Sequence, residues 1–192
     1  AISITATAVG NHAFRFEGAG AKIQSASDIT ISATQGNWGL TMYDNSFIQS
    51  TKANPASTGN ISIIASGTRG GMYTNTTGGI YASSNTASPT ATPTAGGTLS
   101  ITATGGAEQG LYINGGSLIS FGAMAISGAA TTTENGVRLI GSGEIKAVGD
   151  ISIDAVTGAG NNSWSMYQVD SRFTQSISGS ISINASASEG YG

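Results

Sequence analysis

The chain has 192 residues, of which 9% are charged, and 7 Lys and Arg against 10 Asp and Glu give a net charge of −3. This balance offers no basic surface for nucleic acid, and no apolar run approaches the ~20 residues of a membrane-spanning helix. The sequence has no cysteine, which excludes disulfides and thiolate metal sites. Its 29 Gly and 39% hydrophobic residues suit many short strands joined by tight turns.

A short phrase of an apolar, a polar or small and an apolar residue recurs along the whole chain. Its copies begin at residues 2, 29, 61, 99, 124, 151 and 181, so the steps between them are 27, 32, 38, 25, 27 and 30 residues. A loose repeat that continues from one end of a sequence to the other is typical of a solenoid.

Each repeat is predicted to hold two further short strands after this first one. The second strands are expected at residues 14–16, 40–42, 72–73, 111–113, 137–139 and 166–167, and the third strands at 21–23, 47–49, 80–82, 118–120, 144–146 and 172–174. The excursions 49–59 and 74–97 are expected to be loops. We therefore predict an all-β fold, a parallel β-helix of about seven coils of three short strands, with residues 1–192 as one segment.

Stacking of equivalent strands defines which side chains face the interior. Alternation along each strand predicts a buried ladder of equivalent residues with the intervening serines, among them Ser62 and Ser152, facing outward. The predicted interior ladder contains Ile31, Ile63, Ile101, Ile126 and Ile153.

Aromatic and cationic side chains follow the outer side of the predicted second strands. Tyrosines beside arginines at strand spacing can stack, and such a strip is a plausible platform for a sugar. The alternative is that aromatic residues merely favour strands and shield an exposed sheet. The candidates for ligand or glycan contact are Arg15, Tyr43, Tyr73, Tyr112, Arg138 and Tyr167.

The outer side of the first strands carries mostly serine and threonine, in two ranks. Such ranks resemble an ice-binding face, although Ile64, Ala125, Asp154 and Asn184 interrupt them. A polar face that keeps the protein soluble with little charge is the alternative.

Catalytic chemistry has little support in the sequence. No two acidic residues align in adjacent coils, whereas hydrolysis by paired carboxylates needs two such groups within about 10 Å. The single histidine, His12, is expected in a turn. We therefore predict a protein that is not an enzyme, with no metal and no cofactor.

The first and last predicted core strands carry interior residues without an evident cap. Solenoids usually cover their open ends, so strands of neighbouring segments or like subunits are expected to pair there, in a longer rod or filament. The candidates for this end-to-end pairing are Ile2, Ile4, Ile181 and Ile183.

The repeat itself resembles that of a known class of protein. Clear copies lie at residues 59–63, 97–101 and 149–153, and in most coils a glycine-rich turn and a Leu-Tyr or Met-Tyr pair follow. This pattern is similar to the shaft repeats of filamentous-haemagglutinin-like exoproteins of two-partner secretion and of autotransporter passengers. The resemblance implies a right-handed parallel β-helix, secretion to a Gram-negative bacterial cell surface, and adhesion. Host or surface glycans are the partners expected beside neighbouring segments or like subunits. No functional residue carries over from it.

These observations favour a non-enzymatic structural or adhesive segment of a secreted bacterial surface filament. Two alternatives stay open at this point. One is a glycan-active β-helix enzyme of the polysaccharide lyase or hydrolase type, and the other is an ice-binding solenoid.

Overall fold

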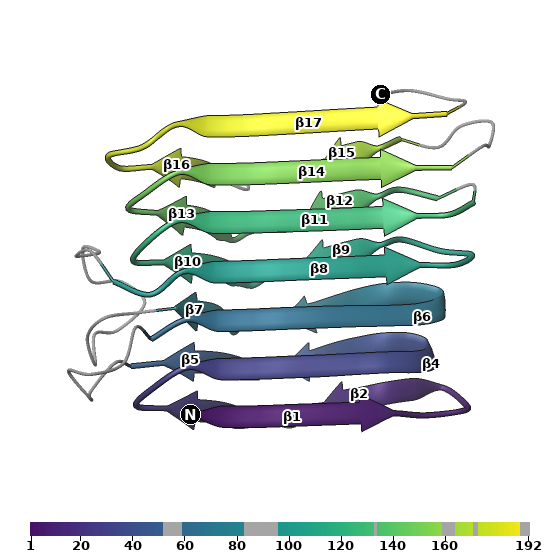
Figure 1. The fold of residues 1–192 in the computed structure, drawn as a ribbon, viewed down its shortest axis with the longest axis horizontal. Coiled ribbons are helices and arrows are strands. Elements are labelled where there is room, and N and C mark those ends of the chain that lie inside the picture. Colours follow the sequence, from purple (N-terminus) through teal and green to yellow (C-terminus); the bar gives the residue numbers. More distant parts are fainter. Residues whose placement is uncertain (52–58, 83–95, 133, 159–163, 171–172, 189–192) are drawn as a thin grey trace.

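The structure, a computed structural model, describes residues 1–51, 59–82, 96–132, 134–158, 164–170 and 173–188. These residues form an all-β parallel solenoid, and no helix occurs among them. Within this described part, accordingly, no helix is long and apolar enough to cross a membrane. Equivalent strands stack directly on one another along the axis of the solenoid, from the N-terminal strand at one end to the C-terminal strand at the other (Figure 1).

The first ladder of stacked strands forms the front of the molecule in Figure 1. Every step in it is parallel and pairs residues that occupy the same place in the repeat. Its members, in order, are β1 (Ile2–Thr7), the first part of β4 (Ile29–Asp44), the first part of β6 (Ile61–Thr76), β8 (Leu99–Gly105), β11 (Met124–Ala130), β14 (Ile151–Thr157) and β17 (Ile181–Ala187).

The second ladder stacks the strands that follow these, also in parallel. It consists of β2 (His12–Phe16), the second parts of β4 and β6, β9 (Leu111–Asn114), β12 (Val137–Ile140) and β15 (Met166–Gln168).

The third ladder is a separate parallel sheet. It consists of β3 (Lys22–Ser25), β5 (Phe47–Ser50), β7 (Gly79–Ala82), β10 (Ser117–Ser120), β13 (Glu144–Ala147) and β16 (Phe173–Ser176). The second and third ladders both pass through six strands, so the chain makes about five turns from the first to the last. The predicted count of seven coils is therefore not confirmed, because β17 is followed by no second or third strand among the described residues.

The interior is filled by apolar side chains in register. In the first ladder Ile31 pairs with Ile63, Ile63 with Ile101 and Ile101 with Ile126, and each is at most 1% exposed. Ile153, the next residue in this column, is fully buried. The alternation that predicted this ladder is confirmed, since the intervening serines face outward and are partly exposed.

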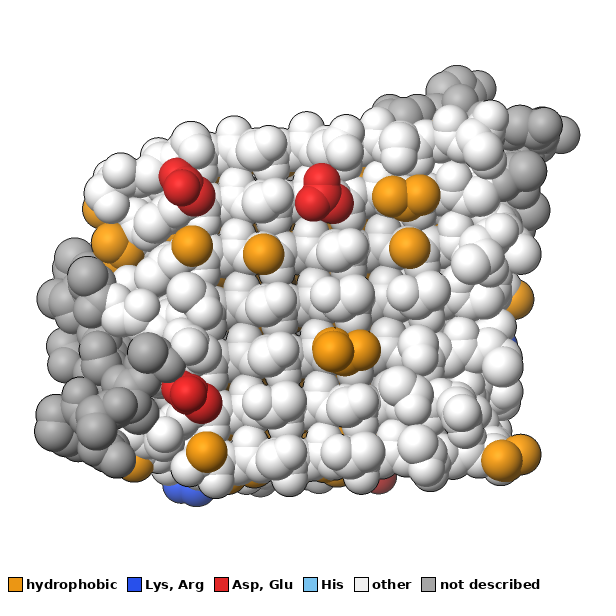
Figure 2. All heavy atoms as spheres, viewed as in Figure 1, with side chains coloured by type: hydrophobic (Ala, Val, Ile, Leu, Met, Phe, Trp, Pro, Cys, Tyr) orange, Lys and Arg blue, Asp and Glu red, His pale blue; other side chains and the backbone are white. Residues whose placement is uncertain are grey.

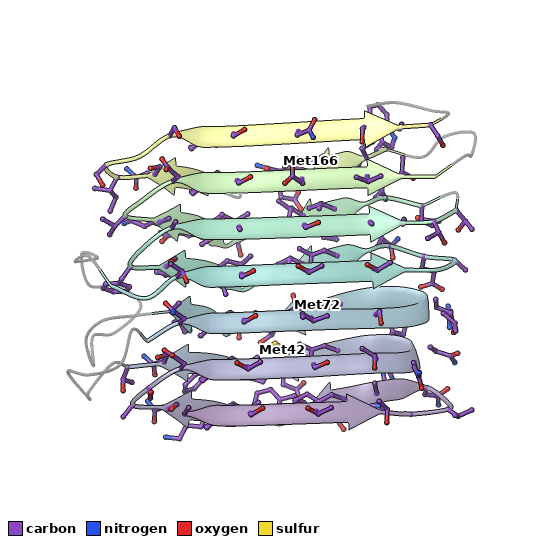
Figure 3. All side chains as sticks on the ribbon, viewed as in Figure 1. Met42, Met72 and Met166 are labelled. Carbon is purple, nitrogen blue, oxygen red and sulfur yellow. The ribbon has the colours of Figure 1, made fainter. Side chains whose placement is uncertain are left out.

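Methionines belong to the same core on the second ladder. Met42 and Met72 are fully buried, and Met166 is partly buried against the cluster. Figure 3 places Met42 and Met72 at neighbouring heights of the stack and Met166 higher up, near its C-terminal end. Burial on this scale stabilises the fold by about 1.5–3 kcal/mol for each large apolar side chain, so the stacked interior is the main stabilising feature of the molecule.

The strands β4 and β6 differ from the prediction because each runs without a break through the corner between the first and second ladders. The prediction placed two separate strands in each of these coils, but each strand has 16 residues. Register shifts beside Gly36 allow the bend. At Gly39 a Cβ atom would lie 2.5 Å from the Ser66 amide nitrogen, so this corner brings neighbouring backbones too close for a side chain.

The two predicted excursions are shorter than expected. Residues 49–50 belong to β5, residues 74–76 to β6 and residues 79–82 to β7. The remaining parts of both predicted loops fall mainly on residues 52–58 and 83–95, which lie outside the described residues.

Candidate ligand-binding surface

The outer side of the second ladder brings the predicted contact residues together. Five of them share one register position: Arg15, Tyr73, Tyr112, Arg138 and Tyr167. The prediction is wrong in one detail, because Thr41 and not Tyr43 holds this position in β4. Tyr43 lies two residues further along, where it pairs with Asn75.

Side-chain contacts nevertheless keep Tyr43 in the row. The Arg15 guanidinium lies 5.1 Å from the centroid of the Tyr43 ring, and the Tyr43 and Tyr73 centroids are 5.6 Å apart. Tyr73 in turn meets Tyr112 edge to face, with centroids 4.9 Å apart. We call the row of Arg15, Tyr43, Tyr73, Tyr112, Arg138 and Tyr167 the Tyr–Arg stripe.

At its C-terminal end the stripe continues through a cation held between two rings. The Arg138 guanidinium lies 4.9 Å from the Tyr112 centroid and 5.5 Å from the Tyr167 centroid. Both distances lie within the range of cation–π attraction. The Nε atom of Arg138 is buried and has no hydrogen-bond partner, and the ion pairs of the described residues do not include this guanidinium. Its described partners are therefore the two rings.

Arg15 at the other end has a different partner. Its guanidinium forms an ion pair with Glu17 at 2.6 Å, in an exposed setting. An exposed pair of this kind contributes about 0–1 kcal/mol, so its main effect is to neutralise the cation at this end of the stripe.

Trp38 extends the stripe sideways and was not among the predicted site residues. Its ring meets Tyr73 edge to face at 5.4 Å between centroids. Its register partner is Gly70, where a Cβ atom would lie 2.1 Å from the indole ring. A glycine opposite a tryptophan in the adjacent coil was the available signal, but it becomes readable only when the register is known.

His12 is the first residue of β2, so the prediction that it lies in a turn is wrong. It pairs with Trp38 in β4, and its Nδ1 lies 3.2 Å from the Thr41 hydroxyl. Burial, followed by the positive charge of Arg15, lowers the pKa of His12 below its usual value. At neutral pH the imidazole ring of His12, beside the stripe, is therefore uncharged.

Burial also raises the pKa of the Tyr73 hydroxyl, with smaller contributions from Tyr112 and Tyr43. The central hydroxyl of the stripe thus stays protonated at neutral pH and can both donate and accept a hydrogen bond. The stripe therefore offers ring surface, hydroxyls and one cation, Arg138, that forms no ion pair with a carboxylate of the described residues. This combination suits stacking and hydrogen bonding with a ligand.

A polar groove runs beside the stripe at the corner between the second and third ladders. Its volume is about 570 Å³. It crosses four successive turns of the solenoid, and it is lined by Asp44, Asn45, Asn75, Thr76, Thr77, Asn114, Gly115, Gly141 and Ser142. We call it the corner groove. Asn75 and Asn114 follow Tyr73 and Tyr112 by two residues in β6 and β9, which is about 7 Å along a strand.

The outer side of the first ladder is a contrasting, flat surface. Figure 2 shows it as neutral polar atoms with few acidic or hydrophobic side chains. Ile64 is 50% exposed and Val156 44% exposed, and Asp154 lies beside Ser127 and Asn184 in the register. We call this surface, the outward residues of the first ladder, the hydroxyl face.

The predicted end-to-end residues lie at the two outermost strands of the first ladder. Ile2 and Ile4 are partly buried against the core. Ile181 is 45% and Ile183 52% exposed, whereas their register partners in β14 are at most 1% exposed. Interior side chains of β17 are therefore accessible from one side of the stack.

The described part of the chain shows neither a cluster of metal-binding side chains nor a pair of acidic side chains in register. It holds no group of three or more His, Asp or Glu side chains arranged for a metal ion. Where the register of a described strand includes an acidic side chain, the paired residue is not acidic, as for Asp44 with Thr76 and Asp154 with Ser127.

The chain was compared with family models, with curated proteins and with solved structures. No family model, no curated protein and no solved structure matches this chain.

Proposed function

We propose that the chain is a non-enzymatic structural and adhesive segment of a secreted bacterial surface filament, and that the Tyr–Arg stripe contacts glycans. The observation that carries the proposal is the unbroken row of ring and guanidinium contacts from Arg15 to Tyr167 on a rigid stack of strands. Aromatic rings with hydroxyls beside them suit the apolar faces and hydroxyl edges of sugars. The bacterial surface as location, and filament-like adhesins as the class, rest on the resemblance of the repeats.

The handedness and the number of coils of the solenoid are part of the same proposal. We propose a right-handed solenoid of about seven coils of three strands, within a longer rod. The right hand follows the strong preference of parallel crossover connections for that hand, and the seven strands of the first ladder support the number of coils.

Pairing at the ends of the stack would extend the rod. Ile181 and Ile183 present interior side chains at the edge of β17, and an exposed strand edge is a template for another strand. We propose that this edge, and the edge of β1 that carries Ile2 and Ile4, take a parallel strand from a neighbouring segment or a like subunit.

The experiment for the stripe replaces Tyr43, Tyr73 and Tyr112 together by serine. Binding to glycan-coated surfaces should fall, because the three rings provide the stacking surface, while far-UV circular dichroism stays that of a β-solenoid. The matched control replaces Ser62, Ser100 and Ser152 on the hydroxyl face by alanine and should leave binding unchanged. Unchanged binding in the tyrosine variant would contradict a role for the stripe.

One observation favours a second candidate function for the hydroxyl face. Its small outward side chains lie in register across successive strands about 4.8 Å apart, as an ice-binding surface would require. A thermal-hysteresis measurement on the purified chain tests this, with Thr102→Tyr as the variant expected to abolish any activity. Absence of hysteresis in the unaltered chain would remove this candidate.

A further inference from the structure

We propose that the corner groove is a subsite for the hydroxyl groups of a neutral, linear glycan that lies along the solenoid axis. This inference rests on the glycan-binding role proposed for the Tyr–Arg stripe and specifies the class of ligand. The groove crosses four turns of the solenoid, about 14 Å at the spacing of parallel strands. A site of that length and open shape suits several units of a chain better than a single sugar.

The two amides at the centre of the groove are held in a defined orientation. The Asn114 Nδ2 group donates to the Asn75 Oδ1 atom over 3.3 Å. This bond uses the acceptor of Asn75 and a donor of Asn114, so Asn75 keeps its amide donors and Asn114 keeps its carbonyl oxygen. The pair therefore offers a donor and an acceptor on adjacent turns, which is the pattern that neighbouring sugar hydroxyls can satisfy.

The position of the amides fits the stripe. Asn75 and Asn114 lie on the same strands as Tyr73 and Tyr112, two residues further on and on the same outward side. A sugar stacked against the rings would thus have its hydroxyl edge near the amides. Aromatic surface for stacking and fixed polar groups for orientation are the usual combination in ligand sites.

The charges that line the corner groove favour a neutral glycan over an acidic one. The lining includes one carboxylate, Asp44, and no Lys, Arg or His. One oxygen of Asp44 already accepts the Gly18 amide over 3.2 Å. Of the two cations of the stripe, Arg15 is paired with Glu17. Arg138 lies between the rings of Tyr112 and Tyr167 and does not line the groove, and the chain carries a net charge of −3. A glycan rich in carboxylates would meet repulsion from Asp44 without a cation in the groove to offset it.

The test is binding of matched hexasaccharides, measured by calorimetry: cellohexaose, mannohexaose and maltohexaose as neutral probes and hexagalacturonate as the acidic probe. At least one neutral probe should bind, and the acidic probe should bind more weakly. Asn75→Ala and Asn114→Ala should each weaken that binding about fivefold, the effect of losing one hydrogen bond. Asn184→Ala, an exposed asparagine on the hydroxyl face, is the control and should change nothing.

The outcomes separate the two proposals. If the tyrosine variant loses binding but Asn75→Ala and Asn114→Ala bind as the unaltered chain does, the stripe stands and the groove subsite is overturned. Tighter binding of hexagalacturonate would overturn the neutral class. Failure of the unaltered chain to bind any of the four probes would overturn both. In the supporting case, ligand addition should also shift the side-chain amide resonances of Asn75 and Asn114 in the nitrogen-15 spectrum.

Discussion

The hydroxyl face and the face that carries the Tyr–Arg stripe are built on the same rule but present different chemistry. On both, apolar residues alternate inward and stack in register, and the inward residues of both reach full burial, as for Ile31 and Leu40 on β4. Outward, the first ladder carries small hydroxyl side chains, whereas the second carries rings and guanidinium groups. The repeat therefore specifies the interior of the stack and leaves each outer face free to carry different side chains.

Neighbouring turns are also coupled differently on the two faces. On the stripe the coupling runs through rings and cations, with contributions of about 0.2–1 kcal/mol for a cross-strand pair. At the entry to the first ladder it runs through side-chain oxygens. The Asp28 carboxylate accepts the Asn60 amide N–H over 2.8 Å, and the Asn60 side chain accepts the Thr98 amide N–H over 2.9 Å.

A charge should destabilise the fold far more at an inward position of a strand than at the outward position beside it. Ile101→Asp places an uncompensated charge in the stacked interior and should destabilise the fold by about 3–5 kcal/mol. Thr102→Asp, one residue further along the same strand and exposed, should change stability by less than about 0.5 kcal/mol. Urea unfolding of both variants measures the difference. Similar losses in the two would show that the alternation does not decide burial here.

A medium effect concerns the glycine beneath the tryptophan. Gly70→Ala would place a Cβ atom 2.1 Å from the Trp38 ring, so the ring must shift and its contact with Tyr73 must change. We expect a loss of about 1–3 kcal/mol, as for overpacking. The measurement is thermal unfolding, together with Trp38 fluorescence in a Trp164→Phe background.

The control for this variant is a double-mutant cycle with Trp38→Ala. If the clash with the ring is the cause, Gly70→Ala should cost little once the ring is removed. Ser100→Ala on the hydroxyl face should be nearly neutral in both backgrounds. A full penalty without the ring would place the cause in the backbone and would separate Gly70 from the stripe.

Much of the fold could be predicted from the sequence because the repeat reports burial directly. Ile61, Ile63 and their counterparts mark every strand of the first ladder, and alternation then fixes which residues face inward. The corner of β4 and β6 could not be predicted in this way. Whether the chain turns or runs on there depends on how closely the backbones approach at Gly39, a property of the stacked coils and not of one segment.

The site was predictable only in part. The row of tyrosines and arginines is visible in the sequence. The place given to Tyr43 was wrong although the predicted strands at 14–16 and 40–42 already align Arg15 with Thr41, which is the register that the structure has. Trp38 and the corner groove were missed. The groove arises where turns of four successive coils come together, and such turns have no common motif that the sequence could reveal.

A smaller effect should appear in the pH dependence of stability, because a carboxylate links neighbouring turns at the entry to the first ladder. The Asp150 carboxylate occupies the same place as Asp28 and accepts the Ser180 amide over 2.7 Å and the Ser180 hydroxyl over 2.9 Å. These bonds, the backbone one first, lower the pKa of Asp150 below its ordinary value of 3.8. Because the folded state holds the proton less tightly than the unfolded chain, this contribution is present above the ordinary pKa and is lost as the pH falls through the lowered one.

The chain itself supplies the matched variant for that prediction. Asn60 makes the equivalent bond to Thr98 with an amide oxygen that does not titrate in this range. Asp150→Asn should therefore keep the bond to Ser180 and flatten the acid dependence of the urea midpoint, with stability near neutral pH little changed. Amide exchange should reveal where the effect lies. In acid, protection in β17 should decrease in the unaltered chain, while protection in β9 and β12 beneath the stripe stays constant. An equal decrease in all three strands would mean that acid acts on the whole stack and that the two faces do not differ in how their turns are coupled.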